Sequence, residues 1–144
     1  MFSRRPRCTP RPRRALLRAV AAGLAWAAAG CGEAGTDAGA VSVEFARAEH
    51  EAGRALLIDI REPDEHATGV VAGAKLLPMR QLAARVGEIP TDAGRPVLLI
   101  CRTQNRSSAT LRALRERGYA HVRYVDGGMR EWARRGWPMV KPGS

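Results

Sequence analysis

The chain has 144 residues, with 24 lysines and arginines against 14 acidic residues and a formal net charge of +10. This length leaves room for one domain of ordinary size. Seven of the basic residues precede Cys31 and no acidic residue does, so the excess charge lies largely at the start of the chain. No basic stripe interleaved with aromatic residues follows, which excludes the composition of a nucleic-acid-binding protein, and we expect no nucleic-acid partner.

Residues 1–30 have the composition of an export signal. An arginine-rich start precedes the apolar stretch "AVAAGLAWAAAG", which is too short to span a bilayer by itself. "PRRALLR" (Pro12–Arg18) resembles a twin-arginine export signal, and "AAGC" (Ala28–Cys31) resembles a lipobox, whose cysteine is lipidated. We predict a signal peptide over residues 1–30 and a lipidated Cys31. The protein would be an exported bacterial lipoprotein, tethered to a membrane in the periplasm or cell envelope. The alternative is a plain secretory signal with Cys31 unmodified.

The cysteine count changes once the leader is removed. Cys8 would be lost with the signal peptide and Cys31 would carry lipid, which leaves Cys101 as the one thiol. Such a thiol is either an inert buried side chain or a reactive group. Small and polar residues predict a flexible tether over residues 31–40, followed by one folded domain over residues 41–140.

Short apolar runs alternate with helical patterns along this domain. That alternation predicts an α/β fold, with an open, mostly parallel sheet covered by helices on both faces. In chain order we expect a helix at Glu44–Ala52, strands at Ala55–Ile60 and Ala74–Pro78, a helix at Gln81–Val86, a strand at Pro96–Cys101, a helix at Ser107–Arg117, a strand at His121–Val125 and a helix at Met129–Arg135.

Cys101 is placed where such a sheet binds its ligands, at the carboxyl end of a central strand and just before a helix. If residues 102–106 curl tightly, their backbone amides can surround one anion at the positive end of that helix. Arg102 and Arg106 would add positive charge. A sulfur anion at Cys101 would then be stabilised without a histidine. The alternative is an inert core cysteine flanked by solvated arginines.

Three segments of the domain resemble one known family, the rhodanese-like domains. "DIREPDEHATGVVAGAKLLP" (Asp59–Pro78) resembles the first signature of the family and "CRTQNRS" resembles its active-site loop. "GGMREWARRGWP" (Gly127–Pro138) resembles its closing glycine pair and tryptophan-proline end. The three matches occur in the order typical of the family and cover nearly all of the chain after the tether.

This resemblance implies a sulfurtransferase of the thiosulfate type. Cys101 would be catalytic, taking a sulfane sulfur from thiosulfate or a persulfide donor and passing it to a thiol or cyanide acceptor. The loop has four residues between its cysteine and its last arginine, whereas related phosphatases use one more. We expect no cofactor, and the three histidines lack the spacing of a metal site. The substrate-binding residues would be Arg102, Thr103, Gln104, Asn105, Arg106 and Ser107, with Asp59 and Arg61.

The active-site loop departs from the family pattern at one position. Gln104 stands where glycine is most common, so we expect backbone strain or an altered loop there. Asp59 could orient an arginine near the site or could organise the turn that follows it. Glu62 and Pro63 are interpreted as a helix or turn opener. The alternative function is a catalytically weak protein with the same fold that acts as a binding module for a small oxyanion or a persulfide-bearing partner.

Overall fold

The structure is a computed structural model, and it describes residues 38–143. Its sheet has five parallel strands in the order β1-β5-β4-β2-β3. Strand β4 (Val97–Ile100) is central and pairs on one side with β2 (Leu56–Asp59) and on the other with β5 (Val122–Val125). The two edge strands are short, β1 at Ala40–Val41 and β3 at Lys75–Leu76.

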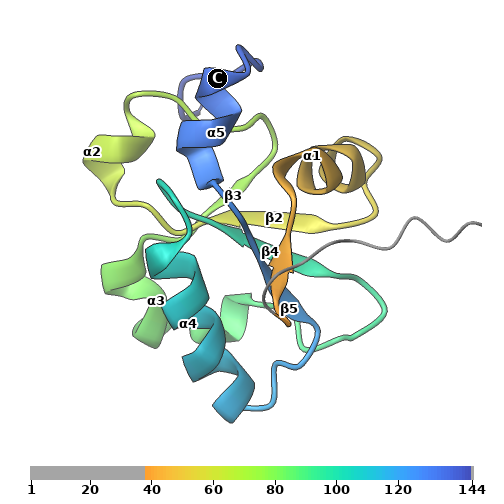
Figure 1. The fold of residues 1–144 in the computed structure, drawn as a ribbon. Coiled ribbons are helices and arrows are strands. Elements are labelled where there is room, and N and C mark those ends of the chain that lie inside the picture. Colours follow the sequence, from red (N-terminus) through yellow and green to blue (C-terminus); the bar gives the residue numbers. More distant parts are fainter. Residues whose placement is uncertain (1–37, 144) are drawn as a thin grey trace, which may run out of the picture. The chain divides into compact units, whose positions relative to one another are not determined.

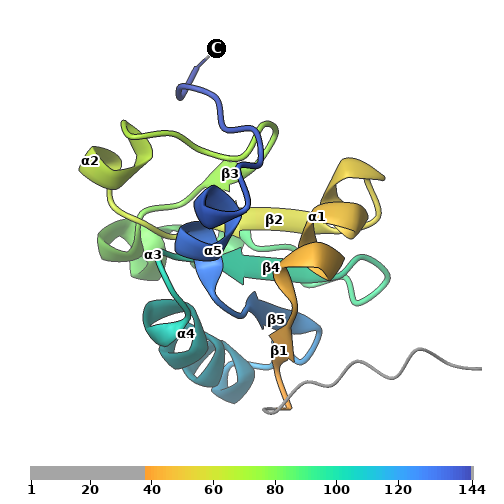
Figure 2. The same cartoon turned by 45° about the horizontal axis from the view of Figure 1, so that its top comes forward.

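Helices cover both faces of this sheet, as Figures 1 and 2 show. One face carries α1 (Val43–Glu51) and α5 (Gly128–Arg134), and the other carries α3 (Met79–Arg85) and α4 (Asn105–Glu116). A short helix α2 (Pro63–His66) follows β2, and a 3-10 turn at Val86–Glu88 follows α3. The sequence therefore forms the layered α/β fold that its alternating pattern predicted.

The core lies in two layers because side chains of a strand alternate between the faces of its sheet. Leu98 and Ile100 pack toward α1 and α5 together with Trp132, which is 2% exposed. Leu99 and Cys101 pack toward α4, against Leu111 and its neighbours. All four residues of β4 are buried, as expected for a strand covered on both faces. The side chain of Cys101 therefore projects to the α4 side of the sheet.

The four expected strands and the four expected helices are confirmed, with ends shifted by a few residues. Strand β1 was not expected because two residues carry no periodic signal, and it begins at Ala40, the last residue of the expected tether. Helix α2 was too short to predict, although Glu62 and Pro63 do open it. The predicted signal peptide and lipidation site lie outside the described residues. Within residues 38–143, no helix has the length and apolar character needed to cross a membrane.

Candidate functional site

Cys101 lies directly after β4, where the chain turns into α4. Its side chain is 1% exposed. The Sγ atom lies 3.4 Å from the hydroxyl oxygen of Ser107, which is itself within 3.1 Å of the carbonyl oxygen of Gln104. That hydroxyl can donate its proton to the carbonyl when Cys101 is a thiol, or to Sγ when Cys101 is an anion. Ser107 therefore supplies one polar contact to a sulfur that otherwise packs in the core.

The loop after Cys101 is held by the beginning of α5. The amide of Met129 donates to the carbonyl of Cys101 at 2.8 Å, and the amide of Arg130 donates to the carbonyl of Arg102 at 2.9 Å. In a trans peptide the N–H points opposite to the C=O. The amides of Arg102 and Thr103 therefore point away from α5.

Gly128 allows α5 to approach the loop this closely. A Cβ at this position would overlap the carbonyl oxygens of Thr103 and Cys101, and Gly128 has a φ of +55°. Both the space and the backbone angle require glycine here. The glycine pair is therefore part of the loop's support.

The backbone amides of the loop are a further feature of the site. In the part of the chain that the structure describes, no hydrogen bond uses an amide of residues 102–107 as its donor. Residues 105–107 form the first turn of α4, where unpaired amides and the helix dipole both favour an anion. This segment can therefore bind a negatively charged group through its backbone.

Gln104 does not strain the loop. Its φ is −135° and its ψ is −12°, and no residue other than glycine has a positive φ within residues 38–143. Of the two expected outcomes, backbone strain at a left-handed residue is not found, and an altered loop stays a prediction. The turn of the chain is supplied instead by α4, which begins at Asn105, two residues earlier than expected.

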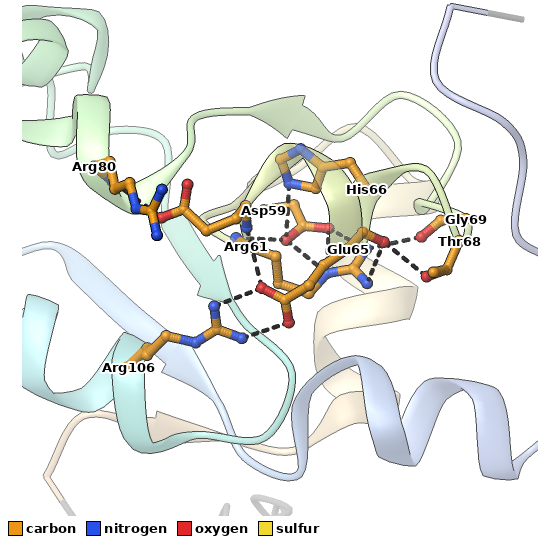
Figure 3. Close-up of polar contacts among 9 residues, drawn as sticks. Asp59, Arg61, Glu65, His66, Thr68, Gly69, Arg80 and Arg106 are labelled. Carbon is orange, nitrogen blue, oxygen red and sulfur yellow. Dashed lines mark hydrogen bonds and ion pairs between the residues drawn. The ribbon is translucent and has the colours of Figure 1, made fainter.

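Arg106 forms an ion pair with Glu65 of α2 (Figure 3). Its two terminal nitrogens donate to the two carboxylate oxygens at 2.6 and 2.7 Å. The hydrogen bonds from Arg106 lower the pKa of Glu65 to about 2. Glu65 in turn raises the pKa of Arg106, and Cys101 contributes to that shift more weakly. The guanidinium of Arg106 is thus bound by another residue, Glu65.

Asp59 and Arg61 form a buried pair behind the loop (Figure 3). Nε and Nη2 of Arg61 donate to the carboxylate at 2.7 to 3.0 Å, and the amide of Arg61 donates to it at 3.0 Å. Both alternatives for Asp59 are therefore realised, because it orients an arginine and also caps the turn. Arg61 further donates to the carbonyls of Glu65 and Gly69. Its guanidinium is largely engaged within the protein.

His66 packs beside this pair, 4% exposed. Its Nε2 atom lies 3.4 Å from Oδ1 of Asp59 and has no hydrogen-bond partner among the described residues. No group of three or more histidine, cysteine or acidic side chains in residues 38–143 is placed to hold a metal.

A cavity of about 350 Å³ opens beside the loop and is lined by residues of α2 and α5. Arg102 is the loop residue on its wall, and Arg130 of α5 also lines it. Sequence reasoning missed Arg130 because its helix alone does not distinguish it from the solvated arginines of other helices. The one available signal was its position three residues after Gly127, the first residue of the glycine pair. The other lining residues are Arg61, Glu65, Thr68, Met129, Ala133 and Met139.

The predicted site residues thus fall into two groups. Arg102, Thr103, Gln104, Asn105, Arg106 and Ser107 form the loop and the helix start next to Cys101. Asp59 and Arg61 lie behind that loop as a buried pair. Arg106 links the groups through Glu65.

This architecture and its sequence match those of known proteins. Residues 42–135 match the model of the rhodanese-like domain. A protein of Allochromatium vinosum named sulfurtransferase is 42% identical over 87 residues, which are 60% of this chain and 79% of the relative. The uncharacterized protein YqhL of Bacillus subtilis is 40% identical over 79 residues. The matched segment makes up 55% of this chain and 61% of that relative.

Solved structures of proteins with the same fold also align with this chain. A rhodanese-related protein from Thermoplasma volcanium aligns with a TM-score of 0.63 and 25% identity, over 70% of this chain and 96% of that protein. The three motifs, the parallel sheet and the matched residues all lead to one assignment: the chain belongs to the rhodanese-like domain family.

Proposed function

We propose that this protein is a sulfurtransferase that carries a sulfane sulfur on Cys101. In the first half-reaction the Cys101 thiolate attacks the outer sulfur of thiosulfate. The bond between the two sulfurs of thiosulfate breaks, sulfite leaves with the electron pair, and Cys101 becomes a persulfide anion. In the second half-reaction, an acceptor such as cyanide attacks the terminal sulfur of the persulfide. The bond between the two sulfurs breaks, thiocyanate leaves, and the Cys101 thiolate is regenerated. No external oxidant or reductant is required.

One observation carries this proposal: within the described residues, the amides of residues 102–107, in the segment that follows Cys101, have no hydrogen-bond acceptor. Thiosulfate, the Cys101 thiolate and the terminal sulfur of the persulfide are all anionic. Backbone amides fixed before the reaction stabilise such charge without reorganising. Ser107 and the charge of Arg106 support the same anion. The sulfurtransferase named among the relatives is consistent with this chemistry.

Steady-state kinetics of the full chain with thiosulfate and cyanide test the proposal. We expect thiocyanate formation with parallel double-reciprocal plots, because a persulfide separates the two half-reactions. Cys101→Ser should abolish turnover, whereas Ser108→Ala, at a half-buried neighbour of the site, should retain it. If the wild-type protein turns over none of several donors but still binds sulfite or thiosulfate, it is a binding module and the enzymatic proposal fails.

Residues 1–31 support a further proposal, that the protein is exported and anchored by lipid at Cys31. The support is the sequence alone, an arginine-rich start and an apolar stretch that ends in "AAGC". Labelling bacterial cells with a tagged fatty acid should mark the wild-type chain and leave Cys31→Ser unlabelled. Equal absence of label from both would contradict the anchor.

A further inference from the structure

Helices α3 and α4 lie side by side on one face of the sheet (Figures 1 and 2) and together line another cavity, of about 310 Å³. Its lining residues recur at helical spacing on both helices, so the cavity is a groove that follows the two helices. We call it the α3/α4 groove. Its apolar lining consists of Met79, Leu82, Ala83, Ala109, Ala113 and Leu114.

The apolar lining of the α3/α4 groove reaches from the core to the surface. Leu114 is 1% exposed and Leu82 is half-buried. Met79 is 40% exposed, and Ala109 and Ala113 are also exposed. Apolar surface that continues over two neighbouring helices marks a site of interaction more often than isolated exposed apolar residues do. Methionine is common on such surfaces because its flexible side chain adapts to a partner.

Thr110 adds a polar group to this apolar surface. It lines the groove and is 7% exposed. Its hydroxyl has no hydrogen-bond partner among the residues that the structure describes. Buried hydroxyl groups are normally paired in native proteins. The hydroxyl of Thr110 is therefore available to a polar group that enters the groove.

Arg117 gives the groove its charge. It is the one charged residue of the lining, and it is exposed. Its guanidinium has no ion pair or hydrogen bond within residues 38–143, and its acidic neighbour Glu116 is not part of the lining. Arg117 follows Thr110 by seven residues, which is two helical turns or about 10 Å. The groove therefore matches a partner with an acidic group about two turns from a polar one.

The shape of the groove favours a helix as its occupant. Two neighbouring helices leave between them a furrow that accepts the side-chain ridge of a third. Proteins recognise amphipathic helices in this way, through apolar side chains repeated every three or four residues. The apolar stretch at residues 19–30 of this chain lacks the required charge, because no acidic residue precedes Glu33. The matching helix thus belongs to another protein.

We propose that the α3/α4 groove binds an amphipathic, acidic helix of a partner protein. Apolar side chains of that helix contact Met79 and Leu114, a polar side chain contacts Thr110, and a carboxylate pairs with Arg117. None of these four residues belongs to the sulfur site. The inference therefore goes beyond the proposed function, and the two can fail separately.

A fluorescent helical peptide of about 15 residues tests the groove in the full chain. One face carries leucines and one serine, the other carries glutamates, and a twin peptide has glutamine in place of every glutamate. We expect saturable binding by fluorescence anisotropy. Arg117→Gln should weaken the acidic peptide roughly fivefold and leave the twin unchanged. The matched control Arg112→Gln, at an exposed arginine outside the groove, should bind both peptides as wild type does.

A second pair of variants tests the apolar contact. Ala113→Leu fills the groove from an exposed position and should weaken both peptides on the order of tenfold. Ala84→Leu, exposed on α3 but outside the lining, should have no effect. Both variants should form the Cys101 persulfide at the wild-type rate, which shows that they fold.

Four results would overturn the inference. The first is that the acidic peptide does not bind, and the second is that Ala113→Leu binds it as tightly as wild type. The third is an equal loss in Arg112→Gln and Arg117→Gln, which indicates attraction by net charge alone. The fourth comes from sedimentation of the full chain without peptide. A dimer that Ala113→Leu abolishes would assign the groove to a second copy of this chain.

Discussion

Glu65 and Arg106 are 41 positions apart in the chain, yet their side chains form two hydrogen bonds of 2.6 and 2.7 Å. The pair joins α2 to the first turn of α4, next to the loop that follows Cys101. Because the carboxylate binds both terminal nitrogens, the guanidinium has a fixed orientation. Arg106 therefore contributes a positioned charge to the site.

Glu65→Gln should lower the free energy of unfolding by an amount that depends on pH. The folded protein lowers the pKa of Glu65 from 4.5 to about 2, chiefly through its hydrogen bonds to Arg106. A lowered folded pKa means that this stabilisation is complete above pH 4.5 and is lost as the pH falls toward 2. It amounts to at most about 3 kcal/mol. Urea unfolding between pH 7 and pH 2.5 should show the difference between wild type and variant shrinking with acid.

Asp64→Asn serves as the control for that experiment, since Asp64 is exposed on the same helix. It should stay within about 0.5 kcal/mol of wild type at neutral pH, as surface substitutions usually do. A gap between wild type and Glu65→Gln that stays constant across the pH range would contradict the assigned role of the ion pair.

Asp59→Ala should be the most destabilising of the polar substitutions. Asp59 is fully buried and Arg61 is 5% exposed, so removing the carboxylate leaves a buried guanidinium without its counter-charge. Breaking such a pair costs about 3–5 kcal/mol. The free energy of unfolding in urea measures this loss. A loss below about 1 kcal/mol would show that water or another group compensates Arg61 and would refute the structural role.

Gly128→Ala should damage the loop, whereas Gly53→Ala should cost only backbone strain. Both glycines have positive φ, +55° and +70°, but a Cβ at Gly53 meets open space and one at Gly128 meets the loop carbonyls. We expect about 1 kcal/mol for Gly53→Ala and a further 1–3 kcal/mol or so for Gly128→Ala. Displacement of the loop should slow persulfide formation on the order of 100-fold. Equal rates in the two variants would contradict the support role of α5.

Gln104→Gly should give no gain in activity. Gln104 already has a negative φ, so glycine relieves no strain and only adds freedom to the unfolded chain, at a cost of roughly 0.5–1 kcal/mol. The rate of persulfide formation from thiosulfate and the unfolding free energy check both parts. A clear increase in rate or in stability would restore the view that glutamine distorts the loop.

Much of the fold could be predicted because its signals are local. The strand at Val97–Ile100 is a run of buried apolar residues, the strand at Leu56–Asp59 is apolar up to its last residue, and Gly53 and Gly118 follow the ends of helices. On α4 the buried face is set by the large side chains: Leu111 and Leu114 are buried, whereas Ala109 and Ala113 are exposed.

The site was less predictable because its arrangement depends on distant contacts. The position of Cys101 followed from the strand and helix around it. The binding of Arg106 by Glu65, the contact of α5 with the loop carbonyls and the place of Arg130 all join segments far apart in sequence. No local pattern encodes such contacts, since they arise only when the sheet is assembled.

The mass of the intact chain after incubation with thiosulfate tests the central claim most directly. We expect the wild-type protein to gain the mass of one sulfur atom, removable by cyanide, and peptide mapping to place it on Cys101 rather than on Cys8 or Cys31. Cys101→Ser should gain nothing. Failure of the wild-type protein to gain sulfur from thiosulfate and from organic persulfides, or a gain that survives in Cys101→Ser, would contradict the account.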